Sequence, residues 1–188
     1  MIALSDLWLP ILASAVFVFV ASSILHMVIP IHKGDYKKLP GEDKLLEAMR
    51  GERLEPGTYM FPCPESMKAM GSPEMLAKYG QGPVGFMTVI SNGPPAMGKN
   101  LTQWFIYTLV IGVFVAYLGA LALGRGVEYG VVFRFTGTAA ILGYALAAVP
   151  ESIWKGQRWG VTLTFIFDGL VYGLVTGATF AGLWPAAA

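Results

Sequence analysis

Four long apolar stretches, each bounded by polar or turn-forming residues, dominate the pattern of this chain. A helix rises 1.5 Å per residue and the hydrocarbon core of a bilayer is about 30 Å thick, so about 20 mostly apolar residues are needed to cross it. Four stretches meet this length and are predicted to be transmembrane helices: Leu7–Pro30, Leu101–Gly124, Val127–Val149 and Val161–Trp184. The predicted fold class is an all-α membrane protein, a four-helix transmembrane bundle.

The segment between the first two apolar stretches reads differently, with short alternating elements separated by proline and glycine. The apolar residues Leu45, Leu46 and Met49 predict a short amphipathic helix, and Ser72 before Pro73 predicts the start of a second helix at an N-cap. Two strands are also expected, at Gly57–Phe61 and Val84–Ile90. We therefore expect a small mixed α/β, βαβ-like cap, which divides the chain into 1–30 (helix 1), 31–100 (cap) and 101–188 (helices 2–4).

Composition supports a membrane protein and excludes other classes. The chain is 55% hydrophobic and 13% charged, with a mean hydropathy of +0.58, whereas about a quarter of the residues of a soluble domain are charged. The net charge of +1 comes without a basic stripe, so we expect the lipid bilayer and no nucleic acid as a partner. A single cysteine, Cys63, excludes an internal disulfide and a CxxC pair.

The distribution of basic residues predicts the orientation. Of thirteen lysines and arginines, all but Arg125 and Arg134 lie in the 31–100 segment or in the short connection before the last span. By the positive-inside rule the 31–100 segment is cytoplasmic and both termini are outside, in a plasma membrane or a bacterial inner membrane. The five tryptophans fall near the predicted span boundaries, as an aromatic belt requires.

Small residues recur at helical spacing in three of the spans. The last span carries them every fourth position, in the pattern of a glycine zipper, and the second and third spans repeat the device; the residues singled out are Gly169, Gly173, Gly177, Ala181, Gly112, Ala116 and Gly143. Such faces allow backbones to approach closely, which is how helices associate in lipid. The sequence leaves open whether the partner face belongs to the same chain or to another copy in a homo-oligomer.

Asp168 is a carboxylate inside an apolar span, about two helical turns from its start. Burying it in hydrocarbon costs roughly 2.5–3.5 kcal/mol on insertion scales, so it requires a partner. One hypothesis is a structural ion pair with Arg134 in the third span. The other is an ion or proton pathway in which His26, with Ser22 one turn earlier, faces Asp168, together with Tyr144 and Tyr172.

Other chemistry is not favoured by the sequence. His26 and His32 lie six positions apart on either side of Pro30, and no histidine lies in another span, so this spacing does not favour a haem or copper site. We therefore expect no metal and no cofactor. Cys63 would need a base, for which His32 is the only candidate near in sequence, and we assign no catalytic residue and do not favour an enzyme.

These observations favour a multi-pass membrane protein with a non-enzymatic role, as an assembly or structural subunit of a membrane complex or as a homo-oligomer. The alternative is a small proton- or cation-coupled transporter or channel that uses Asp168 with His26 or Arg134. The 31–100 segment has no assigned role in either.

Overall fold

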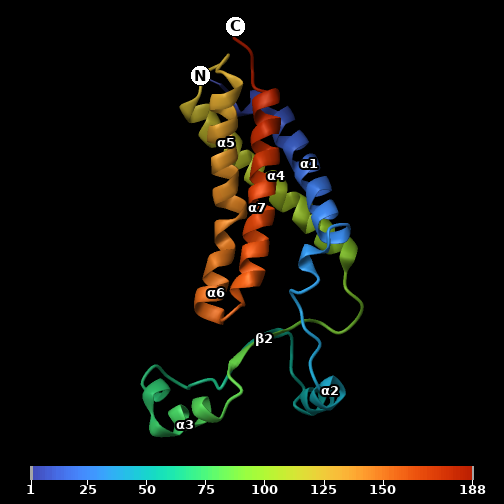
Figure 1. Cartoon of the computed structure of the whole chain (residues 1–188), viewed down its shortest axis with the longest axis vertical. Helices are drawn as coiled ribbons and strands as arrows, with labels where there is room; N and C mark the ends of the chain where they lie inside the picture. Colours follow the sequence, from blue (N-terminus) through green and yellow to red (C-terminus); the bar gives the residue numbers. More distant parts are fainter. Residues whose placement is uncertain (1, 188) are drawn as a thin grey trace. The chain divides into compact units, whose positions relative to one another are not determined.

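The computed structural model describes residues 2–187 and is mostly helical (Figure 1). Among these residues, four helical segments are long and apolar enough to cross a membrane: Leu4–Met27, Met97–Ala122, Tyr129–Lys155 and Trp159–Gly182. They correspond to the four predicted spans, and they are compatible with a multi-pass membrane protein. The chain divides into two compact units, one made of the residues up to Asp35, Ala96–Ile153 and those from Gln157 onward, the other of Tyr36–Pro95 with Trp154–Gly156.

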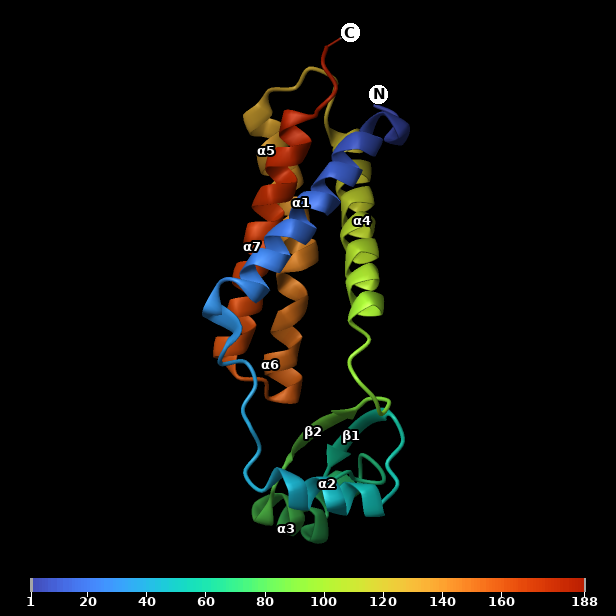
Figure 2. The same cartoon turned by 90° about the vertical axis from the view of Figure 1, so that its right-hand side faces the viewer.

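The first unit contains the long helices. Its elements are the 3-10 turn η1 (Leu4–Leu7), α1 (Trp8–Met27), the 3-10 turn η2 (Pro30–His32), α4 (Met97–Ala122), α5 (Tyr129–Tyr144), the 3-10 turn η4 (Leu146–Ala148), α6 (Val149–Lys155) and α7 (Trp159–Gly182). α1 contacts α4 and α7, α4 contacts α5, and α5 contacts α7 most extensively, so each helix has two neighbours in a closed ring (Figure 2). Successive spans run in opposite directions, and every neighbouring pair is therefore antiparallel.

The third span is interrupted before Pro150, which was not predicted. α5 ends at Tyr144, a 3-10 turn follows, and α6 then continues the span to Lys155. The predicted end at Val149 was therefore too early, and Trp154 and Lys155 are helical rather than part of the connecting loop. A broken helix in a membrane is tolerated where neighbouring protein covers the break, and here Gly169 of α7 lies directly against Ala145.

The glycine face of α7 packs against α5 within the same chain. A Cβ atom added to Gly173 would lie 2.3 Å from Ile141 Cγ1, and one added to Gly177 would lie 2.9 Å from the Cα of Gly137. Real Cβ atoms essentially never lie closer than 3.0 Å to another atom, so this approach requires glycine at both positions. In this structure the partner of this face is α5 of the same chain.

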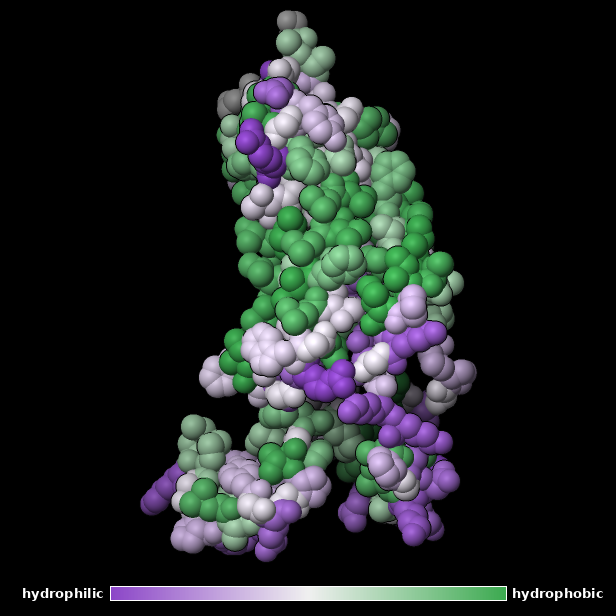
Figure 3. All heavy atoms as spheres, in the orientation of Figure 1, coloured by the Kyte–Doolittle hydropathy of each residue, from purple (hydrophilic) through white to green (hydrophobic). Residues whose placement is uncertain are grey.

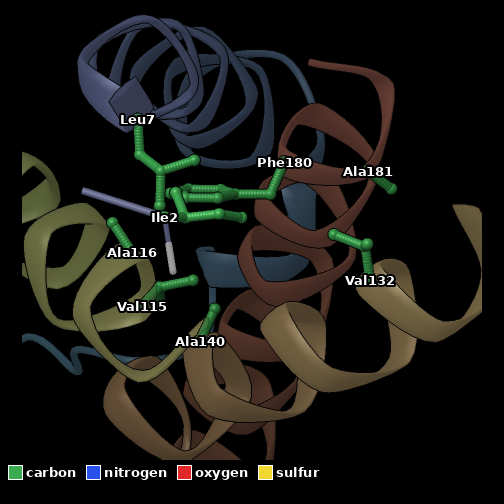
Figure 4. Close-up of a cluster of buried hydrophobic side chains, with 8 residues drawn as sticks. All are labelled: Ile2, Leu7, Val115, Ala116, Val132, Ala140, Phe180 and Ala181. Carbon is green, nitrogen blue, oxygen red and sulfur yellow. The ribbon is translucent and has the colours of Figure 1, made fainter. Parts of the chain in front are cut away.

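The other predicted packing residues also have partners within the chain. A Cβ on Gly112 of α4 would touch Ile11 and Ser14 of α1, and one on Gly143 would lie 2.9 Å from Ile111 of α4. Ala116 and Ala181 are buried in a core cluster near the chain termini. The cluster also contains Ile2, Leu7, Val115, Val132, Ala140 and Phe180 (Figure 4).

The outer surface of the helical unit is apolar. Side chains such as Phe17, Phe114 and Leu163 are more than half exposed, and hydrophobic residues cover the visible face of the helices (Figure 3). In water such a surface would be a large exposed hydrophobic patch, whereas in a bilayer it faces acyl chains. The surface is therefore the one that a membrane-spanning bundle requires.

The second unit contains α2 (Glu42–Gly51), β1 (Gly57–Phe61), the 3-10 turn η3 (Ala69–Gly71), α3 (Pro73–Gln81) and β2 (Gly85–Val89). β1 and β2 form a two-stranded sheet, with Gly57 opposite Val89. The strands were predicted, but they pair antiparallel, so the unit is not a βαβ arrangement with parallel strands. None of residues 36–95 is buried, so this unit has little hydrophobic core of its own.

Helix α3 shows how the local sequence sets its bounds. The Ser72 hydroxyl accepts a hydrogen bond from the Met75 amide at 3.2 Å, which confirms the predicted N-cap. One turn into the helix, Lys78 Nζ lies 2.9 Å from Glu74 Oε1, and this hydrogen bond and the opposite charge lower the pKa of Glu74. Both side chains are exposed, so the pair contributes little to stability.

Candidate functional site

The end of α1 and the turn after it place two histidines together. Pro30 has no amide hydrogen and restricts the residue before it, so the helix stops at Met27 and a 3-10 turn follows. η2 contacts α7, and in Figure 2 the light-blue chain after α1 turns beside the lower part of α7. The His32 ring then stacks on the His26 ring, with 4.0 Å between centroids and 16° between planes.

Asp168 of α7 meets both rings. It lies about 14 Å along the helix from Trp159, and its side chain is only 3% exposed. His32 Nε2 is 3.0 Å and His26 Nε2 is 3.9 Å from Asp168 Oδ2. One potential ligand atom from each of the three residues lies within 4.8 Å of the other two. Residues far apart in the sequence thus form one cluster, which we call the His–His–Asp site.

The hydrogen bonds at the far side of each ring determine where its proton sits. His26 Nδ1 lies 3.1 Å from the Ser22 carbonyl oxygen, and His32 Nδ1 lies 2.7 Å from Asp35 Oδ2. Both of these oxygens only accept hydrogen bonds, so each Nδ1 carries the hydrogen and donates it. In the neutral form of each ring, Nε2 therefore has a bare lone pair, and both Nε2 atoms lie beside Asp168.

This arrangement gathers acceptors without a donor. His32 Nε2 and both Asp168 carboxylate oxygens are buried and have no hydrogen-bond partner among the described residues. A buried carboxylate without a donor is costly, and two neighbouring lone pairs make it worse. A positive charge at this point, whether a proton on one of the histidines or a bound cation, offsets the charge of the carboxylate.

A phenylalanine ring packs against the site, and a cleft lies beside its two histidines. Phe165, one turn before Asp168 on α7, has its ring 5.7 Å from that of His32. A cleft of about 410 Å³ is lined by residues 26–30, His32 and Lys33. The His26 side chain is 45% exposed, whereas that of Asp168 is 3% exposed. The two histidines therefore lie between the cleft and the carboxylate with which they pair.

The polar residues predicted around Asp168 lie on the same face of α7 or opposite it. Tyr172 follows Asp168 by one turn and is 4% exposed, and its ring contacts that of Tyr144, with 5.6 Å between centroids. The Tyr172 hydroxyl has no hydrogen-bond partner among the described residues. Ser22 donates to the Phe19 carbonyl and accepts from Trp104 Nε1 at 2.9 Å, which ties α1 to α4.

Arg134 does not belong to this site. Its Nε donates to the Gly130 carbonyl of its own helix at 3.0 Å, and its side chain is exposed. Among the described residues, the ion-pair partners of Asp168 are His32 and His26. The structural Asp168–Arg134 pair considered from the sequence is therefore not formed, because α5 presents Arg134 outward.

Two residues at the site, His32 and Asp35, were not identified from the sequence as partners of Asp168. They lie beyond the first predicted span, and only a reverse turn brings them back to α7. A usable signal was present: the two histidines of the chain flank a proline at a helix end, which permits the chain to fold back. Cys63 is exposed, and its Sγ lies 3.9 Å from the neighbouring Pro64 carbonyl oxygen.

Comparisons with models of protein families, with curated proteins and with solved structures find no match for this chain.

Proposed function

We propose that the chain is a multi-pass integral membrane protein that binds a cation at the His–His–Asp site. The observation that carries this proposal is the convergence of His32 Nε2 and both oxygens of the buried Asp168 carboxylate with no hydrogen-bond donor among the described residues. A cation satisfies all three atoms at once. This proposal belongs to the cation-handling class named above as the alternative, with His32 in the place considered for Arg134.

The proposed orientation gives the site a side of the membrane. The positive-inside rule favours a cytoplasmic 31–100 segment and external termini, in a plasma membrane or a bacterial inner membrane. The site lies where α1 leads into this segment, so the cleft beside His26 would open to the cytoplasm. The bound cation would then be drawn from the cytoplasmic pool.

The assembly or structural role, in a membrane complex or a homo-oligomer, stays a prediction. The small-residue faces on which it was based are engaged within the chain: Gly169, Gly173 and Gly177 against α5, and Gly112 against α1. Those faces therefore no longer argue for a second copy. Native mass spectrometry or light scattering of the detergent-purified protein would measure its oligomeric state directly.

Cation binding is tested by thermal unfolding in detergent, with Na⁺, K⁺, Mg²⁺, Ca²⁺, Mn²⁺ and Zn²⁺ titrated separately. A ligand at 100 times its dissociation constant stabilises the folded state by about 2.7 kcal/mol, which corresponds to roughly 5–11 °C for a chain of this length. We expect at least one ion to raise the unfolding midpoint of the parent protein but not that of Asp168→Asn. If no ion distinguishes the two proteins, the proposal fails.

A further inference from the structure

The geometry points to a mononuclear site for a divalent first-row transition metal ion of the zinc type, with His26, His32 and Asp168 as its ligands. This inference rests on the cation-binding role proposed above and specifies the ion. Imidazole nitrogen suits zinc, copper, iron and nickel, whereas Mg²⁺ and Ca²⁺ take oxygen ligands. Two nitrogens and one carboxylate therefore select against the abundant hard cations.

The spacing of the ligand atoms fits one ion. With metal–ligand bonds of about 2.0–2.2 Å, two ligands of a tetrahedral zinc ion lie about 3.3–3.6 Å apart. The Nε2 atoms of His32 and His26 are 3.0 and 3.9 Å from Asp168 Oδ2, which are values on either side of this range. Because the two rings stack face to face, with 4.0 Å between centroids and 16° between planes, the half-exposed His26 ring must rotate for both Nε2 lone pairs to meet at one ion.

Each histidine also has the outer partner that metal-binding histidines need. A ligating imidazole almost always donates its other ring N–H to a carboxylate or to a backbone carbonyl, which fixes the tautomer and the ring orientation. Asp35 provides the carboxylate for His32, at 2.7 Å, and the Ser22 carbonyl serves His26, at 3.1 Å. Asp35 is thus a positioning residue rather than a ligand.

The charge of the cluster matches a divalent ion. Asp35 and Asp168 contribute two negative charges, and their side chains are 7% and 3% exposed. His32 pairs with both carboxylates and His26 pairs with Asp168, while Lys33 lines the cleft. One divalent ion between neutral histidines neutralises both carboxylates.

The site offers three protein ligands, which leaves a fourth position. Structural zinc sites are closed by four protein ligands, whereas sites that act on another molecule keep a position for water or substrate. The half-exposed His26 and the cleft of about 410 Å³ place that fourth position on the open side. A small anionic or neutral ligand can join the ion there.

The experiment is equilibrium dialysis of the tag-free, full-length protein in detergent against Zn²⁺, with metal analysis, and Co²⁺ as a spectroscopic probe. We expect one Zn²⁺ per chain, and visible Co²⁺ bands from nitrogen and oxygen ligands without a thiolate charge-transfer band. His32→Gln and Asp168→Asn should each weaken Zn²⁺ binding at least about 100-fold, because each removes a ligand. Asp35→Asn should weaken binding about 10–100-fold while the Co²⁺ spectrum keeps its ligand type.

Two control variants separate this site from adventitious binding. Cys63→Ser removes the exposed thiol, and Asp6→Asn removes a carboxylate near the other end of α1. Both should leave the Zn²⁺ affinity unchanged. A Zn²⁺ affinity that falls with Cys63→Ser, or that survives His32→Gln and Asp168→Asn, overturns the inference.

The outcome also separates this inference from the proposed function. The Co²⁺ spectrum of the unaltered protein reports the ligands even if a variant fails to fold, and absence of nitrogen ligation overturns the inference on its own. If only Na⁺, K⁺, Mg²⁺ or Ca²⁺ stabilises the parent protein over Asp168→Asn, the cation-binding proposal stands and the transition-metal site is refuted. If azide leaves the Co²⁺ bands unchanged, the fourth position is not open.

Discussion

Replacing Gly169 with alanine tests the contact between α7 and the interruption of the third span. A Cβ atom at position 169 would lie 2.6 Å from the Cα, 2.7 Å from the Cβ and 2.7 Å from the backbone N of Ala145. Two of these are backbone atoms, so no side-chain rotation relieves the clash. The two helices must separate locally for the alanine to fit.

The size of the effect follows from the distances. Ordinary Cβ contacts begin at 3.4 Å, so the backbones must move apart by about 0.8 Å, which is an overpacking change that costs about 1–3 kcal/mol. For a chain of this length each kcal/mol lowers the unfolding midpoint by about 2–4 °C. We expect Gly169→Ala to lower the midpoint by about 2–12 °C.

Thermal unfolding in detergent, followed by the fluorescence of the five tryptophans, measures this shift. Gly160→Ala is the matched control, because Gly160 lies on the same helix and its added Cβ would meet nothing within 4 Å. The control should match or slightly exceed the parent protein in stability, since alanine favours a helix over glycine. If Gly169→Ala unfolds at the same temperature as Gly160→Ala, α7 does not contact the break and the packing described here is wrong.

Three further predictions concern the helical unit. Phe180→Ala empties a fully buried core position and should lower the unfolding free energy by about 3–5 kcal/mol. As the control, Phe167→Ala removes an exposed side chain of the same helix and should change this free energy by less than about 0.5 kcal/mol. Equal effects of the two substitutions would contradict the burial pattern. Trp104→Phe removes the hydrogen bond that the indole N–H donates to the Ser22 hydroxyl. A double-mutant cycle with Ser22→Ala should give a coupling free energy of roughly 0.6–1.5 kcal/mol. A coupling of zero would refute this contact. Gly173→Leu should reduce the yield of folded monomer in size-exclusion chromatography, because its side chain would collide with α5; a folded protein altered only in oligomeric state would instead favour a packing face between copies.

The long-range pattern of the fold could be predicted from the sequence. Hydrophobic stretches of sufficient length have few alternatives to spanning a bilayer, because backbone polar groups must be satisfied internally in lipid. The first strand, Gly57–Phe61, and the N-cap at Ser72 were predicted correctly, since they depend on local propensities and capping. The break after Tyr144 was not predicted, although a signal was present: Pro150 has no amide hydrogen to donate to the Leu146 carbonyl four residues earlier, which disrupts the helix over the preceding turn.

The candidate site could be predicted only in part. The sequence determined that Asp168 needs a partner, because a carboxylate in an apolar helix cannot stay uncompensated, and it placed His26 at the appropriate helix end. Only the tertiary structure decided that the partner is His32 rather than Arg134. The turn at Pro30 brings His32 to Asp168, and Arg134 lies on the outward face of α5. Residue spacing along a helix predicts how deep a side chain lies in the membrane, but it does not predict how the helix is rotated about its axis. The same reason applies to the glycine face of α7: its spacing determined that something packs closely there, and only the arrangement of the four helices decided that this is α5.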